Sequence, residues 1–199
     1  DKLVGINGVI IPDGFGHGGI EGKINAIKYA RENNIPLFGI CLGMQLMVVE
    51  FMRNVVGLKD ANSIEFDENT TNPVINVMES ELETEKKEGT TRLGKYPCML
   101  DVNTNSYNAY GENLIYERHR HNLEFNNNYR DIAVSNGIVL SGLSPDSKFV
   151  EIIEFKNNTW AVGTQFHPEL KSRPHRPHPL FREVVRKSIE NKKWLNIYK

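Results

Sequence analysis

The sequence contains only two cysteines, Cys41 and Cys98, among 199 residues. Two thiols give no disulfide framework, so we expect a protein of a reducing compartment, the cytoplasm. An apolar run of the roughly 20 residues that span a bilayer is also lacking, and so is the pattern of a signal peptide. We therefore expect no association with membranes.

An excess of charge of either sign is missing as well. The chain has 24 basic and 25 acidic residues, a formal net charge of −1, and no composition typical of nucleic-acid binding. Hydrophobic residues make up 39% of the chain, which is ordinary for a soluble globular protein. At this length we expect one domain with a substantial core.

The first third of the chain alternates between strand and helix patterns. A strand at 9–11 runs into a loop with five glycines between residues 14 and 22, and a helix is predicted over 22–33. A strand at 35–40 and a helix at 42–56 follow. This order predicts parallel βαβ units in an α/β sheet. The glycine-rich loop lacks the Gly-Lys-Ser/Thr ending of a phosphate cradle.

The remaining chain predicts shorter elements. Strands are expected at 98–102, 132–134, 139–141, 150–155 and 161–166, and a last helix at 179–191. The charged run 79–88 is interpreted as a solvated surface loop, and the Asn-rich segments 103–108 and 126–128 as loops.

Cys41 lies between the predicted strand at 35–40 and the helix that follows it. At such a sharp turn the side chain projects from the backbone, and the first amide N–H groups of the helix favour a thiolate and a developing oxyanion. Gly39 and Gly43 leave room there for a substrate. A lone cysteine at a strand end is nevertheless more often part of the core.

A cysteine nucleophile needs a base and a group that holds the base. His167 and Glu169 follow the predicted strand 161–166 and are two residues apart, so on extended backbone both project to one face. Glu169 could then accept a hydrogen bond from Nδ1 of His167 and leave Nε2 facing the thiol. Alone, such a pair is more often a surface feature; with Cys41 it predicts a catalytic triad.

These segments resemble those of a known family. GICLGMQ at 39–45 and QFHPE at 165–169 resemble the elbow and the His-Glu segment of class I (triad) glutamine amidotransferases. Further segments are similar to the CTP synthase branch of that family: EGK at 21–23, ANSIEF at 61–66, TRLG at 91–94, ERHRH at 117–121, KSRP at 171–174 and HPLF at 178–181. The resemblance covers nearly the whole chain.

The resemblance implies hydrolysis of L-glutamine to glutamate and ammonia. Cys41 would attack the side-chain amide to form a thioester, His167 would protonate the leaving ammonia and then activate water, and Glu169 would orient His167. It also implies substrate-binding roles. The backbone N–H groups of Gly14 and Leu42 would form the oxyanion hole, Phe15 would flank the pocket, Gln45 would help hold glutamine, Glu65 would pair with its α-ammonium group, and Asn122 stands where the family has an arginine that contacts its carboxylate.

The resemblance further implies a flavodoxin-like α/β fold for residues 1–199, with a central, mostly parallel sheet flanked by helices and a small antiparallel element. A first strand and helix would precede Asp1. Ammonia would pass to an N-terminal synthase domain of the same polypeptide, which is absent here and would use ATP and Mg²⁺ to aminate UTP to CTP in a homotetramer. We expect no cofactor and no metal in this domain, and GTP as an allosteric activator.

Three positions depart from the family pattern. The family usually reads Pro-Gly-Gly-Phe-Gly, and here Asp13 replaces the first glycine, where a positive φ would be strained and a carboxylate would oppose an oxyanion. Gly18 replaces an arginine associated with activation by GTP. Asn122 supplies no charge, so we expect weaker binding of glutamine unless Arg120 or another cation compensates.

These departures keep a second hypothesis open, a degenerate amidotransferase that serves as a regulatory or interaction domain. A stand-alone γ-glutamyl hydrolase is disfavoured by the branch-specific segments. His119 and His121 lack a third ligand for a metal. We place His175 and His178 in a solvated loop, and Cys98 in the core.

Overall fold

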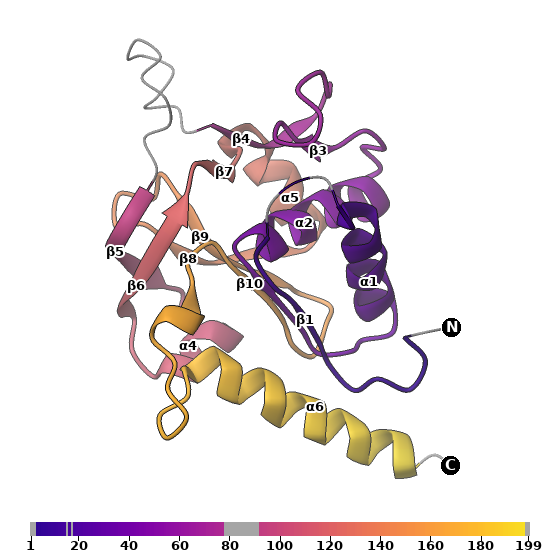
Figure 1. Cartoon of the computed structure of the whole chain (residues 1–199), viewed down its shortest axis with the longest axis vertical. Helices are drawn as coiled ribbons and strands as arrows, with labels where there is room; N and C mark the ends of the chain where they lie inside the picture. The colour runs from indigo at the N-terminus through magenta and orange to yellow at the C-terminus, as the bar shows by residue number, and fades with distance from the viewer. Residues whose placement is uncertain (1–2, 15, 17, 78–91, 198–199) are drawn as a thin grey trace.

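The computed structural model describes residues 3–14, 16, 18–77 and 92–197, with side chains up to residue 192. Figure 1 shows one sheet with α1 (Ile20–Glu32) and α2 (Leu42–Phe51) on one side and α6 (Pro179–Ile197) on the other. Its strands are β1 (Val9–Ile11), β2 (Leu37–Ile40), β5 (Arg92–Leu100), β6 (Leu114–His121), β8 (Ile138–Leu143), β9 (Val150–Phe155) and β10 (Ala161–Thr164). A smaller sheet holds β3 (Asn62–Ser63), β4 (Pro73–Val77) and β7 (Leu123–Phe125).

Two further helices and three short turns complete the described chain. They are α4 (Asn105–Tyr110), α5 (Arg130–Asn136), a π-helical turn at Met52–Val56 and 3₁₀ turns at Asn127–Tyr129 and Pro168–Leu170. One apolar cluster joins α1, α2 and α5 to the sheet, and a second joins α4 and α6 to its other face. Successive residues of β2 point to opposite faces of the sheet, so Leu37 belongs to the first apolar cluster and Phe38 to the second.

The main sheet has the order β1-β2-β10-β9-β8-β5-β6. The strands β1, β2 and β10 pair in parallel, whereas β10-β9, β9-β8, β8-β5 and β5-β6 pair antiparallel. The predicted α/β architecture is confirmed, and parallel pairing holds in the part that carries the βαβ units. The antiparallel part is larger than the small element expected, because β5 and β6 form a long hairpin that extends the sheet.

Several predicted elements differ in the structure. Residues 132–134, expected as a strand, lie in α5, and the Asn-rich segment 103–108 contains α4. Thr104 caps α4, because its side-chain oxygen accepts a hydrogen bond from the Tyr107 amide at 3.2 Å. The strands β4, β6 and β7 were not predicted, and the run 79–88 lies outside the described residues.

Candidate active site

Cys41 forms the junction between β2 and α2, with φ 50° in the left-handed region. Its N–H donates to the Thr164 carbonyl oxygen of β10 at 2.7 Å, and its own carbonyl accepts from the Gln45 amide at 3.1 Å. These bonds to a neighbouring strand and to the helix hold the strained backbone in place. The side chain is buried, with 5% exposed.

The flanking glycines serve packing of the backbone, and the interpretation that they leave room for substrate is wrong. A Cβ on Gly43 would lie 2.2 Å from the carbonyl oxygen of Ile11, and one on Gly39 would lie 2.7 Å from the carbonyl carbon of Gly43. Only glycine lets the first turn of α2 approach β1 and β2 so closely. The sequence therefore positions Cys41 through two close backbone contacts.

His167 and Glu169 follow β10, the strand next to β2. Nδ1 of His167 lies 2.6 Å from Oε1 of Glu169, although Pro168–Leu170 form a 3₁₀ turn instead of extended backbone. Because the carboxylate accepts, Nδ1 carries the proton and donates it. The hydrogen bond to Glu169 raises the pKa of His167 and outweighs the opposite effect of burial. Nε2 of His167 is buried and has no hydrogen-bond partner.

Cys41 and His167 meet at the carboxyl ends of two adjacent parallel strands, and Asp13, just after β1, meets them there. One potential ligand atom of each lies within 4.8 Å of those of the other two. The sequence placed Cys41 and His167 together, and this juxtaposition follows from the parallel pairing of β2 and β10.

Asp13 occupies the position where the sequence analysis placed the oxyanion. Its Oδ1 accepts a hydrogen bond from the N–H of Leu42 at 3.3 Å. Its φ is not positive, so the anticipated backbone strain is absent at this described residue. Burial raises the pKa of the Cys41 thiol, and the Asp13 carboxylate raises it further. The carboxylate thus opposes the thiolate and occupies an amide donor.

Two glutamines form a buried amide pair beside the thiol. Nε2 of Gln165 donates to Sγ of Cys41 at 3.7 Å, while Nε2 of Gln45 donates to the Leu123 carbonyl at 3.2 Å and lies 3.4 Å from Oε1 of Gln165. The side-chain N–H groups of Gln45 therefore donate to other groups of the protein. Gln165 was missed as a site residue, although it lies within the QFHPE segment.

Of the other residues predicted to bind substrate, the structure places Gly14 near Leu42, and it leaves Glu65 and Asn122 on the surface. A Cβ on Gly14 would lie 3.9 Å from Cδ2 of Leu42, so Gly14 lies beside the side chain of Leu42. Glu65 and Asn122 are exposed, the latter at the bend between β6 and β7. Phe15 lies outside the described residues.

A buried charged cluster was also missed. Arg92 of β5 donates to Glu151 at 2.7 Å and to Glu124 at 3.2 Å, and the rings of His119 and His121 are joined by a 2.8 Å hydrogen bond. Burial first, and then the Arg92 charge, lower the pKa of His119 to about 2 and that of His121 to about 3. The cation of this cluster is Arg92, and both histidines are neutral.

Glu117 organises a second buried cluster. Its Oε1 accepts from Tyr110, from Lys171 and from Nε2 of His178, at 3.0, 2.9 and 3.1 Å. His178 is 3% exposed, so its placement in a solvated loop was wrong, whereas the prediction that Cys98 is in the core is confirmed. Both clusters show that β6 is anchored through its alternate inward side chains.

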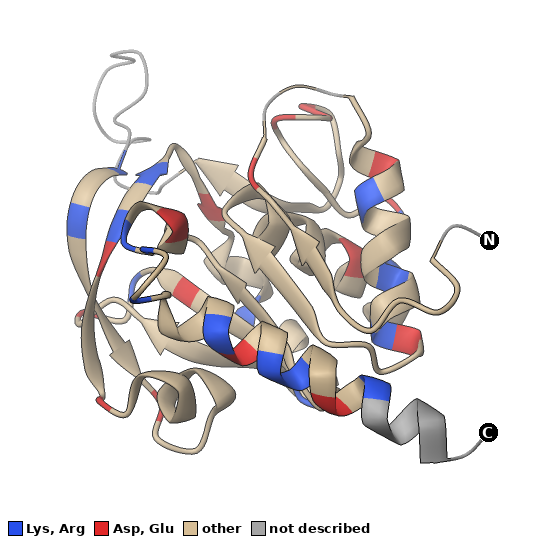
Figure 2. Ribbon diagram, turned by 60° about the horizontal axis from the view of Figure 1, so that its bottom comes forward, with Lys and Arg blue, Asp and Glu red and all other residues tan. Residues whose placement is uncertain are grey.

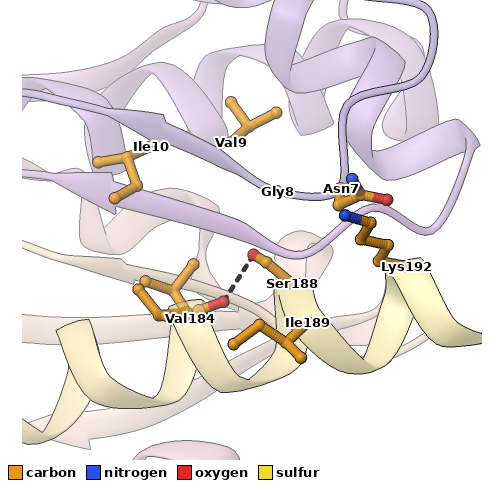
Figure 3. A pocket seen from close by; sticks show the side chains of 9 residues that line it. Asn7, Gly8, Val9, Ile10, Val184, Ser188, Ile189 and Lys192 are labelled. Carbon is orange, nitrogen blue, oxygen red and sulfur yellow. Dashed lines mark hydrogen bonds between the residues drawn. The ribbon is translucent and has the colours of Figure 1, made fainter.

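An apolar pocket of about 300 Å³ lies elsewhere, between residues 7–10 and α6. Figure 3 shows Ser188 among the lining residues, and its hydroxyl donates to the Val184 carbonyl at 2.7 Å. Its lining contains no thiol, imidazole or carboxylate.

Along the exposed face of α6, Lys and Arg alternate with Glu (Figure 2). Among the described residues no helix combines the length and apolarity needed to cross a membrane.

Comparison with known proteins identifies the family of the chain. The family model "Glutamine amidotransferase class-I" matches residues 1–187. The chain is 57% identical over 192 residues to CTP synthase of Caldanaerobacter subterraneus, covering 96% of this chain and 36% of the relative, and 58% identical over 190 residues to that of Ruminiclostridium cellulolyticum, covering 96% and 35%. It thus spans about a third of the length of these curated relatives.

A solved structure, the glutaminase domain of Trypanosoma brucei CTPS with bound acivicin, superimposes with a TM-score of 0.90 at 34% identity, covering 95% of this chain and 73% of that one. The chain therefore belongs to the class-I glutamine amidotransferases, in the branch formed by the glutaminase domains of CTP synthases.

Proposed function

We propose that this chain hydrolyses L-glutamine to glutamate and ammonia, with Cys41 as nucleophile, His167 as general base and acid, and Glu169 as the residue that orients His167. The observation that carries the proposal is the chain of contacts from Glu169 through His167 to Cys41: 2.6 Å between Glu169 and Nδ1, and a ligand atom of each of His167 and Cys41 within 4.8 Å of the other.

The first half-reaction transfers the Cys41 proton to Nε2 of His167, the nitrogen without a hydrogen-bond partner. The thiolate attacks the amide carbon, and the oxyanion binds the N–H groups of Leu42 and Gly14. The imidazolium, stabilised by Glu169, then protonates the leaving nitrogen, so ammonia departs and a thioester remains. In the second half-reaction His167 removes a proton from water, which hydrolyses the thioester.

We further propose that Gln45, Glu65, Phe15 and Asn122 contribute to binding glutamine. The amide N–H groups of Gln45 are engaged within the protein, so a role in binding would fall to its remaining surface or require rearrangement.

The ammonia would serve the ATP- and Mg²⁺-dependent amination of UTP to CTP by an N-terminal synthase domain of the same polypeptide, in a cytoplasmic homotetramer activated by GTP. The relatives' name, CTP synthase, and the third of their length that this chain spans support the synthase part of the proposal. The Mg²⁺, the tetramer and GTP rest on the family resemblance alone, and the cytoplasm rests on the low cysteine content.

The test is covalent labelling with a glutamine-analogue affinity label, followed by mass spectrometry of the peptides. We expect stoichiometric labelling of Cys41, release of glutamate from glutamine, and loss of both in Cys41→Ser. Cys98, which is buried and free, is the internal control and should stay unlabelled.

Absence of labelling and of glutamate release in the folded chain and in the full-length protein would favour the second candidate, a regulatory domain that has lost hydrolysis. The position of Asp13 on the Leu42 amide is the specific observation in favour of that candidate.

A further inference from the structure

Three side chains at the candidate active site also match the donor set of a zinc site. Asp13, Cys41 and His167 offer a carboxylate oxygen, a sulfur and an imidazole nitrogen, all within 4.8 Å of one another. They come from the segments that follow β1, β2 and β10, which pair in parallel, so their positions are fixed by three neighbouring strand ends. Carboxylate, thiolate and imidazole are the ligand types that Zn²⁺ takes in proteins.

His167 supplies an independent indication of a ligand. Its side chain is 7% exposed, and Nε2 has no hydrogen-bond partner. Nδ1 is held by Glu169 at 2.6 Å, which leaves the lone pair on Nε2. A carboxylate behind the distal nitrogen is the arrangement that fixes a metal-binding histidine and makes it a better donor.

The charges also suit a dication. A carboxylate beside a thiolate is a repulsive pair, and the cation recorded nearby is Lys23, whose Nζ lies 3.1 Å from the position that a Cβ on Gly14 would take. A divalent cation would offset the Asp13 carboxylate and the thiolate that Cys41 forms on binding. Asp13 is the contribution of this chain, since the family pattern has glycine at that position and would leave only two of the three donors.

We propose that Asp13, Cys41 and His167 bind Zn²⁺ through one carboxylate oxygen, the Cys41 thiolate and Nε2, with a fourth position open to water. Binding releases the thiol proton to solvent. Tetrahedral zinc with bonds of about 2.0–2.3 Å places its ligands about 3.3–3.8 Å apart, so donor atoms within 4.8 Å of one another need to close by at most about 1.5 Å. Bound zinc occupies the nucleophile and the base, and therefore inhibits glutamine hydrolysis reversibly; this last clause rests on the proposed function.

The direct test is titration of the reduced, metal-free protein with Co²⁺. We expect one equivalent to bind, with a thiolate-to-cobalt charge-transfer band in the near ultraviolet and visible bands of tetrahedral cobalt, and Zn²⁺ to displace it. Cys41→Ser should remove the charge-transfer band, while Cys98→Ser, at the other cysteine, should keep it. Asp13→Gly, which restores the glycine of the family, should weaken Zn²⁺ binding tenfold or more in competition with a chromophoric chelator.

Three results would overturn the proposal: no charge-transfer band, a band that persists in Cys41→Ser, or equal Zn²⁺ affinity in the wild type and Asp13→Gly. Asp13→Asn, which keeps the side-chain shape, serves if the glycine variant does not fold, and it should also weaken binding. Far-ultraviolet circular dichroism establishes folding in each case.

The metal site and the proposed function can fail separately. Cobalt bands without any glutaminase activity would refute the function and leave the metal site standing. Glutaminase activity that Zn²⁺ does not inhibit, in a protein without cobalt bands, would refute the site and leave the function standing. Inhibition that EDTA reverses and that Asp13→Gly diminishes is the result expected when both hold.

Discussion

Replacing Asp13 by glycine is expected to raise the glutaminase kcat/KM of this chain about tenfold. In the proposed mechanism the Leu42 N–H donates to the oxyanion, but in the structure it donates to Oδ1 of Asp13 at 3.3 Å. The oxyanion therefore has to displace the carboxylate before this donor can stabilise it. Glycine removes the competitor and is the residue that the resemblance described above implies at this position.

The magnitude follows from the bond that must break. A hydrogen bond to a charged group contributes about 1.5–3 kcal/mol, and Asp13 belongs at the lower end because it is only half-buried and the bond is long. About 1.4 kcal/mol corresponds to a tenfold change in rate. Burial and the Asp13 charge both raise the pKa of Cys41, so removing the charge should also move the rise of kcat/KM with pH to lower pH.

The assay is release of glutamate from glutamine, coupled to glutamate dehydrogenase, with EDTA present so that no divalent cation binds. Asp13→Asn is the matched control, since it keeps the shape and an acceptor oxygen without the charge, and its kcat/KM should lie between those of Asp13 and glycine. An unchanged or lower kcat/KM in a folded Asp13→Gly protein would refute the reasoning, because the Asp13 carboxylate would then not keep the Leu42 N–H from the oxyanion.

Three further predictions concern other parts of the chain. Asn122→Arg should lower the KM for glutamine about tenfold by adding a charge-assisted hydrogen bond; an unchanged KM would contradict it. Gly43→Ala should destabilise the fold by about 2–3 kcal/mol in urea unfolding, since its Cβ would lie 2.2 Å from a backbone oxygen. As a control, Gly22→Ala in α1 has open space around its Cβ and should stabilise the fold by about 0.5–1 kcal/mol. Burial raises the pKa of Glu117, but its hydrogen bonds outweigh burial and hold that pKa below the usual 4.5. The stabilisation is therefore present above pH 4.5 and lost below it, so Glu117→Gln should cost about 2 kcal/mol at pH 7 and less at pH 3.

Local sequence patterns predicted the elements that surround Cys41. The apolar run of β2, the buried helix α2 that follows and the cysteine between them define the elbow in a short stretch of chain. The same holds for the pairing of His167 with Glu169, although the 2.6 Å hydrogen bond forms across a 3₁₀ turn and not on the extended backbone expected. Local patterns misled where they compete with tertiary contacts: Ile132 and Val134 are β-branched and apolar, yet residues 132–134 lie in α5, where Ala133 packs into the core.

The sequence by itself determined the strand-to-helix elbow that carries Cys41 and the close pairing of His167 with Glu169, because each is specified by neighbours within a few residues. The tertiary pairing of β2 and β10 brought the two segments together. Only the tertiary structure decided that Asp13 reaches the Leu42 amide and the Cys41 thiol, and that Arg92 neutralises buried carboxylates from two other strands. Those contacts depend on which strand ends adjoin and where side chains point once packed, and no local periodicity records that information.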